Sequence, residues 1–252
     1  MGVRKEGEEK AGKAFSGGSI ESILLAIDDA VGVTGKLLDY QVRSITSGKD
    51  SLGEVRVVVE VDGKRRVRVF SVSSSPANKT RASRNRTFSV SVKAHPDGYV
   101  SQFLHNDLLP GTIVYLSQAE GEFVLPHETP DNLLLMSGGS GITPVMSMIR
   151  TLRDSGHTGR VTFLHYARSL EDEMFSGELD EIAAALPQAQ VVRIFTRKPA
   201  DGAELKGRFS IDHLKHLGID PSETLTYVCG PAGLIASVRD TYAELGAIDQ
   251  LR

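Results

Sequence analysis

The stretch that decides the fold is LLLMSGGSGITPVMSMIRTL, residues 133–152. Its first apolar residues run straight into a group of glycines, Gly138, Gly139 and Gly141. Apolar residues then recur at the i, i+3, i+4 and i+7 positions of a helix, as Val145, Met148, Ile149 and Leu152. The pattern predicts a buried strand, a glycine turn and an amphipathic helix.

The glycine turn has two interpretations. Glycines let the backbone approach a ligand because no Cβ intervenes, but such turns also occur for packing alone. In the first interpretation Thr143 caps the helix, Pro144 occupies its first position, and free N–H groups bind a dinucleotide pyrophosphate. The residues predicted to contact the dinucleotide are Gly139, Ser140, Gly141, Ile142, Thr143 and Pro144. No Gly-Lys-Ser/Thr follows, so the turn is not a nucleotide-triphosphate loop.

Three further apolar runs, VTFLHYA, VVRIFT and TYVCG, repeat the alternation of strand and helix. Repeated units of this kind predict a Rossmann-like α/β domain with a parallel sheet, over residues 129–252. The last unit breaks at Gly230 and Pro231. Two breaks at the carboxyl ends of strands predict one ligand-binding crevice.

The preceding residues, 35–128, have the texture of short antiparallel strands, which predicts a small β-barrel. The predicted strands are LLDYQVRSI, EVRVVVEVD, VRVFSVSSS, TFSVSVKA and IVYLSQA, and VSQFLHNDLL is a short helix. Asp62-Gly63 predicts a hairpin. Residues 1–34 are predicted to be a disordered and partly helical N-terminal segment, with Ser19 as a helix cap.

The composition narrows the function. The chain has 252 residues, a net charge of −3 and one cysteine, Cys229. This balance argues against nucleic acid as the main partner, and one cysteine excludes an internal disulfide or an all-protein thiolate cluster. There is no apolar run long enough for a membrane span and no signal-peptide core, so we expect a cytoplasmic protein.

Four motifs occur in an order that resembles the ferredoxin–NADP reductase superfamily: RVFS, GYVS, GGSGITP and CGP. The resemblance covers roughly residues 60–247 and is greatest to FAD-dependent reductase components of oxygenases and desaturases. It implies a flavin-binding antiparallel barrel followed by an NAD(P)-binding domain. It also implies hydride transfer from NADPH to FAD and then electron transfer to an iron–sulfur (ferredoxin-type) or haem protein.

The resemblance assigns the flavin site to three segments. Arg68 would neutralise a flavin phosphate, Phe70 would lie against the isoalloxazine, and Ser71 would reach its N5 atom. The remaining predicted flavin residues are Val69, Ser91, Val92, Lys93, Gly98, Tyr99, Val100 and Ser101. The GYVS helix would offer N–H groups to a pyrophosphate, which favours FAD over FMN. As plain strand residues, Arg68 would be a surface charge and Phe70 part of the core.

The resemblance also places Cys229 beside the nicotinamide C4 atom, as a positioning residue next to Gly230 and Pro231. A lone cysteine is otherwise usually a small buried hydrophobe. The coenzyme choice depends on charge beyond the second and third strands, because a 2′-phosphate needs arginine. The residues predicted to contact it are Arg168, Ser169, Thr196, Arg197 and Arg208. Glu171 is the alternative, since an acid there would bind ribose hydroxyls and favour NADH.

The basic loop 79–86, KTRASRNR, is either solvated or a docking site for an acidic electron-transfer partner. His213 and His216 lie three residues apart, but no further ligand suggests a metal site. The barrel departs from the family, because only five strands are predicted and no Gly-Gln turn precedes RVFS. The chain ends at AIDQLR, where relatives continue, and a [2Fe–2S] partner would be a separate chain. The rival functions are a free-flavin reductase and a catalytically silent binding subunit of reductase fold.

Overall fold

The computed structural model describes residues 2–5, 8–11, 54–61, 64–76, 88–112, 114–117, 119–198 and 205–252. The chain divides into two compact units, Met1–Thr46 and Ser47–Arg252. The described part of the first unit is a hairpin of β1 (Gly2–Lys5) and β2 (Glu8–Ala11). In the antiparallel register of this hairpin, Arg4 lies opposite Glu9 and Lys5 opposite Glu8. The prediction of a disordered and partly helical segment over residues 1–34 did not include these two strands, and the predicted helix after Ser19 lies outside the described residues.

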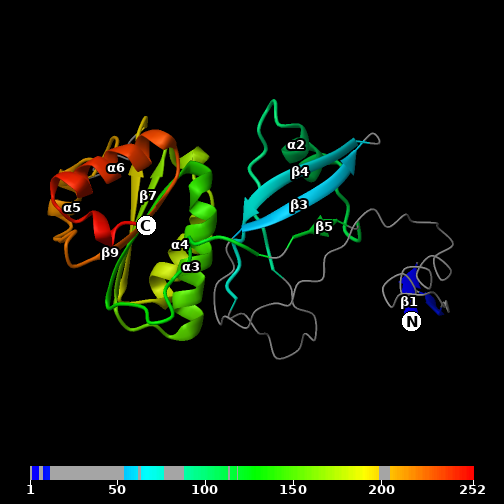
Figure 1. Ribbon diagram of the computed structural model, residues 1–252, viewed down its shortest axis with the longest axis horizontal. Coiled ribbons are helices and arrows are strands. Elements are labelled where there is room, and N and C mark those ends of the chain that lie inside the picture. The colour runs from blue at the N-terminus through cyan, green and yellow to red at the C-terminus, as the bar shows by residue number, and fades with distance from the viewer. Residues whose placement is uncertain are drawn as a thin grey trace. The chain divides into compact units, whose positions relative to one another are not determined.

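The second unit contains the predicted parallel sheet (Figure 1). Its strands are β6 (Asn132–Gly138), β7 (Arg160–Ala167), β8 (Ala189–Phe195) and β9 (Leu225–Cys229), in the order β8-β7-β6-β9. All neighbouring pairs are parallel. Because β6 has β7 on one side and β9 on the other, the strand order reverses between β6 and β9. An α/β sheet binds ligands beyond the carboxyl ends of its strands at such a switch point.

Helices cover both faces of this sheet, as the buried strands require. One face packs against α3 (Ile142–Ser155) and α4 (Ser176–Ala185), and the other against α5 (Ile211–His216) and α6 (Ala232–Glu244). Alternate residues of β6 divide between the two cores: Leu133 and Leu135 belong to the first and Leu134 and Met136 to the second. The α/β part of the predicted fold is thus confirmed. None of the described helices is long and apolar enough to cross a membrane.

The preceding antiparallel part is a three-stranded sheet with the order β4-β3-β5. It contains β3 (Glu54–Val61), β4 (Lys64–Ser71) and β5 (Tyr115–Leu116). Val61 pairs with Lys64, so the predicted two-residue hairpin is confirmed. Helix α2 (Tyr99–Asn106) contributes Val100 to a small core with Val57 and Val72. A closed barrel is not formed by the described residues, and the predicted strand at 37–45 lies outside them.

The predicted strand TFSVSVKA is wrong over the described residues 88–94. Only Val90 pairs there, in an isolated antiparallel bridge to Val72. Elsewhere in this segment, serine side chains make the hydrogen bonds. The Ser89 N–H donates to Ser74 Oγ at 2.9 Å, and the Ser73 hydroxyl contacts the Ser91 hydroxyl at 2.9 Å. Side-chain hydrogen bonds of this kind compete with a strand ladder.

Candidate functional site

The two glycine-containing turns lie against each other at the carboxyl ends of β6 and β9. A Cβ on Gly141 would lie 2.4 Å from the carbonyl oxygen of Cys229, and one on Gly230 would lie 2.9 Å from the backbone nitrogen of Gly138. A real Cβ essentially never approaches so closely. The sequence interpretation based on packing therefore accounts for Gly141 and Gly230. The close packing also creates the narrow junction at which an α/β sheet binds its ligand.

Gly139 and the start of α3 are compatible with an anion bound at the turn. Gly139 has a φ of +54°, and nothing lies within 4 Å of the place where its Cβ would be. No side chain caps α3, whose N-cap residue is Gly141. The prediction that Thr143 caps the helix is wrong, because its hydroxyl donates to the Ser140 carbonyl at 3.1 Å. The helix start therefore keeps its positive end for an anion placed above the turn.

Cys229 ends β9 and is half-buried. It pairs in register with Ser137 of β6, and its side chain packs against the core formed by α3 and α4. Ser137 in turn contacts His165 of β7, with 2.7 Å between the hydroxyl and Nδ1. Burial, followed by the nearby Arg193, lowers the pKa of His165 to about 4. His165 is thus uncharged at physiological pH. Cys229 lies at the edge of the junction between the two glycine turns.

The arginines predicted to select the coenzyme gather at the other end of the same sheet edge. The Arg197 N–H donates to the Arg168 carbonyl at 3.0 Å, and the Gly207 N–H donates to the Phe195 carbonyl at 3.3 Å. These bonds bring the chain next to Arg168, Arg197 and Arg208 together, and all three side chains are exposed. Thr196 is half-buried, with its hydroxyl donating to the Ala167 carbonyl at 3.2 Å. The three exposed arginines therefore extend from neighbouring parts of the backbone near the carboxyl ends of β7 and β8, and this region is called the arginine corner.

Lys198 is a further cation at this corner, and the sequence interpretation missed it. Its ammonium lies 3.9 Å from the Glu171 carboxylate. The pKa of Glu171 is lowered, first by a hydrogen bond from Ser169 and then by Lys198. Ser169 is buried, and its hydroxyl oxygen also lies 3.2 Å from the Asp172 carboxylate. Glu171 thus already has cationic and hydrogen-bonding neighbours.

The RVFS segment divides its side chains between the two faces of β4. Arg68 and Phe70 alternate with Val69, so that Val69 faces the opposite way. Arg68 is exposed and donates to the Val67 carbonyl at 2.8 Å, whereas Phe70 is half-buried against the core of Val57, Val72 and Val100. Val69 is 53 % exposed. Arg68 is therefore available to a phosphate, and Phe70 also serves as a core residue.

The other two predicted flavin segments lie close to RVFS. Ser91 reaches Ser73, two residues beyond Ser71, as described above. The Val92 carbonyl lies 2.6 Å from His105 Nε2 on α2, which connects the SVK segment to the GYVS helix. Lys93 is exposed. The described structure thus brings all three segments to one region, and their roles stay predictions.

The GYVS helix begins at Tyr99, one residue before the predicted stretch VSQFLHNDLL, with Gly98 as its N-cap. The Ser101 hydroxyl donates to the Gly98 carbonyl at 2.8 Å and accepts the His95 N–H at 3.1 Å. Arg66 of β4 lies over the Tyr99 ring, 5.3 Å from its centre. Arg66 is thus a second guanidinium close to the helix start, and the sequence interpretation missed it. An exposed arginine and a helix N-terminus together suit a flavin pyrophosphate.

Two sequence features contribute nothing to this site. The basic loop 79–86 lies outside the described residues. His213 is buried and contacts the Tyr166 hydroxyl at 2.9 Å through Nδ1, so it is a core residue. Among the residues that the structure describes, no three His, Cys, Asp or Glu side chains gather as a metal site.

A parallel sheet with glycine turns at its switch point, an uncapped helix and an arginine corner define a dinucleotide-binding α/β domain. The family model described as Oxidoreductase NAD-binding domain matches residues 135–240. A "NADPH oxidoreductase" of Mycobacterium tuberculosis is 38 % identical over 191 residues, covering 76 % of this chain and 48 % of the relative. The "Glycine betaine monooxygenase reductase subunit" of Chromohalobacter salexigens is 31 % identical, covering 76 % and 51 %.

Solved structures agree with this class. The flavohem-like FAD/NAD-binding domain of nitric oxide dioxygenase from Vibrio cholerae is 26 % identical, with a TM-score of 0.68, over 79 % of this chain and 81 % of that one. The ferredoxin–NADP⁺ reductase of Plasmodium falciparum shares the fold at 21 % identity and a TM-score of 0.62, over 80 % and 81 %. The chain belongs to the ferredoxin–NADP reductase superfamily. The resemblance predicted from the four motifs is therefore confirmed.

The chain spans about half the length of the curated relatives it matches. A second family model, described as LeuA allosteric (dimerisation) domain, matches residues 1–93. This match overlaps β3, β4, RVFS and Ser91. The first part of the predicted flavin barrel is therefore similar to a domain of a different kind. This accords with the missing Gly-Gln turn and with the three-stranded sheet that the described residues form.

Proposed function

We propose that the chain is a flavoprotein reductase that passes hydride from NADPH to FAD and then electrons to an iron–sulfur or haem protein. The observation that carries the proposal is the junction of the two glycine turns beside the uncapped start of α3, with Cys229 at its edge. The likeness to an NADPH oxidoreductase and to monooxygenase reductase subunits supports the same function.

The flavin would lie against the three segments that converge near β4. When bound, FAD supplies the two-electron acceptance and one-electron release that no side chain can perform. Arg68 would pair with its phosphate, and Tyr99 to Ser101 would direct the α2 N-terminus toward the pyrophosphate. Ser71 would donate a hydrogen bond to the reacting edge of the ring. Phe70 would stiffen the strand beneath it through its core contacts.

The nicotinamide side would be held by the residues that start α3. Gly139 to Gly141 would accommodate the pyrophosphate, because Gly139 has no Cβ in the open space above the turn. Cys229, Gly230 and Pro231 would form the wall against which the nicotinamide ring packs. We assign Cys229 a positioning role, since a half-buried thiol at a strand end is a compact apolar contact.

The corner at the ends of β7 and β8 favours NADPH over NADH. Arg168, Arg197 and Arg208 offer guanidinium groups to a 2′-phosphate, and Lys198 adds a further positive charge. Glu171 is exposed beside that lysine and is a weaker candidate for ribose hydroxyls. A phosphate with nearly two negative charges fits this corner better than a neutral ribose.

The electron acceptor is proposed to be an acidic partner that docks on the basic loop 79–86. Two relatives are reductase subunits of a monooxygenase, and one structural relative is part of a nitric oxide dioxygenase. An oxygenase component with an iron–sulfur or haem centre is the acceptor class that follows. Docking through opposite charges predicts an association rate that falls with rising salt.

The absorption spectrum of the purified chain tests the proposal. Stoichiometric bound FAD that NADPH bleaches supports it, whereas a colourless chain that reduces only added flavin supports a free-flavin reductase. Arg68→Ala should raise the Kd for FAD about tenfold or more, because a charge-assisted bond to phosphate is lost. Arg239→Ala, an exposed α6 arginine paired with Asp240, is the matched control. An unchanged Kd for Arg68→Ala contradicts the flavin site.

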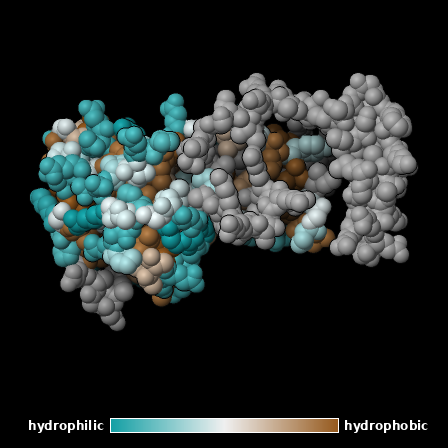
Figure 2. Space-filling view, turned by 90° about the horizontal axis from the view of Figure 1, so that it is seen from below, coloured by the Kyte–Doolittle hydropathy of each residue, from teal (hydrophilic) through white to brown (hydrophobic). Residues whose placement is uncertain are grey.

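A second candidate function is favoured by the match of residues 1–93 to a dimerisation domain. In that case the N-terminal part is an assembly or binding module attached to a reductase fold, and the flavin is absent. Apolar side chains of the antiparallel sheet are exposed, among them Val67 at 40 % and Val69 at 53 %, and apolar surface is visible in this part of Figure 2. Light scattering gives the mass in solution. A colourless dimer supports the module, and a flavin-loaded protein supports the reductase.

A further inference from the structure

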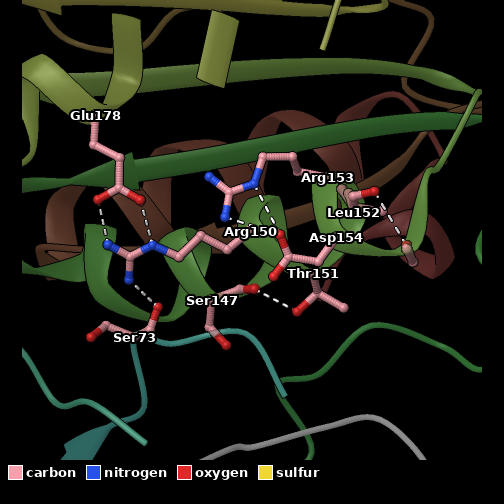
Figure 3. Close-up of polar contacts among 9 residues, drawn as sticks. Ser73, Ser147, Arg150, Thr151, Leu152, Arg153, Asp154 and Glu178 are labelled. Atoms are coloured by element: carbon pink, nitrogen blue, oxygen red, sulfur yellow. Dashed lines mark hydrogen bonds and ion pairs between the residues drawn. The ribbon is translucent and has the colours of Figure 1, made fainter. Parts of the chain in front are cut away.

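Two residues one turn apart on α3 contact consecutive carbonyl groups of the segment that follows RVFS. Figure 3 shows the second of these contacts, from Arg150 to Ser73. The Ser147 hydroxyl donates to the Ser74 carbonyl at 2.7 Å. Arg150 donates through Nη1 to the Ser73 carbonyl. These contacts join residues more than 70 positions apart in the sequence. They connect the helix of the dinucleotide domain directly to the chain of the flavin segment.

Arg150 is itself fixed in place from two further directions. Its Nε and Nη2 donate to the two carboxylate oxygens of Glu178 on α4, at 2.6 and 2.5 Å (Figure 3). Its guanidinium also lies over the ring of Phe175, 5.3 Å from the centre. The Arg150 side chain is only 16 % exposed, and its hydrogen bond lowers the pKa of Glu178. A planar guanidinium held in this way has little freedom, so its donor to Ser73 points in one direction.

Ser73 in turn contacts the second predicted flavin segment, so the contact with Arg150 also restricts the position of that segment. It is fully buried, its N–H donates to the Ser89 carbonyl at 2.8 Å, and its hydroxyl contacts Ser91. Ser74 accepts the Ser89 N–H. The segments on either side of the predicted flavin ring, ending in Ser71 and beginning at Ser91, are therefore joined to α3 through a single group of serines.

The other end of α3 is the glycine turn. Arg150 lies eight residues beyond Ile142, which is about 12 Å along a helix at 1.5 Å per residue. One rigid element thus contacts the proposed nicotinamide turn at its start and the proposed flavin segments in its middle. We propose that Arg150, supported by Ser147 and Glu178, is a positioning residue that sets the approach of the nicotinamide to the flavin. This inference rests on the proposed reductase function.

Hydride transfer requires reacting atoms about 3 to 3.5 Å apart, and a misplacement of about 1 Å can cost about a hundredfold in rate. Arg150→Ala in the full, FAD-loaded chain should therefore slow single-turnover reduction of the flavin by NADPH about ten- to a hundredfold. The Kd for NADPH should stay unchanged, because Arg150 lies away from the turn. Arg150→Lys should give an intermediate rate, since lysine keeps the charge and loses the paired donors. Ser147→Ala should cost less than Arg150→Ala.

Arg153→Ala is the matched control, because Arg153 lies on the same helix and pairs with its neighbour Asp154. Its flavin reduction rate should equal that of the wild type. A second readout that does not depend on turnover is amide hydrogen exchange. The N–H groups of Ser73 and Ser89 should exchange faster in Arg150→Ala and Arg150→Lys, and at the wild-type rate in Arg153→Ala.

The outcomes separate the two claims. A wild-type chain whose bound flavin NADPH does not reduce overturns the proposed function, and this role with it. A wild type that is reduced, with Arg150 variants reduced equally fast, overturns the positioning role alone. Slow reduction with unchanged exchange at Ser73 and Ser89 also overturns it, since Arg150 would then act elsewhere. Slow reduction with faster exchange and an unchanged Kd for NADPH supports it.

Discussion

At the scale of single residues, the arginine corner determines how the chain distinguishes its coenzymes. A charge-assisted hydrogen bond to a phosphate is worth about 1.5 to 3 kcal/mol. Arg197→Ala should therefore lower kcat/KM for NADPH about ten- to a hundredfold, because 1.4 kcal/mol is about tenfold. NADH lacks the phosphate, so its kcat/KM should change much less. Steady-state kinetics with both coenzymes measure the two ratios.

The double variant of Arg168 and Arg197 should lose less than the product of the single losses if both contact one phosphate. Lys215→Ala is the control, because Lys215 is an exposed α5 cation that already pairs with Asp212. Equal losses for NADPH and NADH in Arg197→Ala would show that the residue supports the fold. If the wild type prefers NADH, Glu171 is instead the residue expected to bind the ribose hydroxyls.

At the scale of elements, β7 carries a buried histidine that makes the parallel sheet sensitive to acid. His165 has a pKa of about 4 in the folded chain, against its ordinary value of 6.5. As the pH falls below 6.5, His165 gains a proton in the unfolded chain but not in the folded chain. The folded state therefore loses stability between pH 6.5 and pH 4. Between pH 7 and pH 5, protonation of this histidine in the unfolded chain should lower the free energy of unfolding by about 2 kcal/mol. Urea unfolding at the two pH values measures the loss.

His165→Gln should remove this part of the pH dependence, whatever its effect on stability at pH 7. Burial raises the pKa of nearby Glu173, which works in the opposite direction, so the difference between variant and wild type is the quantity to compare. His127→Gln, at an exposed position, is the control for the substitution itself. A wild-type slope retained in His165→Gln would mean that another group causes it.

At the scale of the whole molecule, the single cysteine limits what the chain can carry. A [2Fe–2S] cluster needs four ligands, usually thiolates, and Cys229 supplies one. The FAD-loaded chain should therefore reduce ferricyanide with NADPH while metal analysis finds no stoichiometric iron. Iron at one or two atoms per chain in freshly purified protein would refute this, and ferricyanide reduction without bound flavin would point to the free-flavin reaction.

Local pattern was sufficient for the elements that depend on near neighbours. The helical period from Val145 to Leu152, the strand runs and the Asp62-Gly63 hairpin predicted α3, the parallel strands and the β3–β4 pair, because such periods report which side of an element is buried. The order of RVFS, GYVS, GGSGITP and CGP was sufficient for the family. Residues 88–94 do not form the predicted strand, because the Ser74 side chain binds the backbone N–H of Ser89.

The sequence by itself thus determined the α/β class, the positions of the glycine turns and the superfamily. Only the tertiary structure decided that Gly141 and Gly230 pack against the opposite turn, that Lys198 neighbours Glu171, and that Arg150 reaches Ser73. The physical reason is distance along the chain. Periodicity reflects forces between residues a few positions apart, whereas these contacts depend on the strand order, which brings together segments about 30 to 90 residues apart.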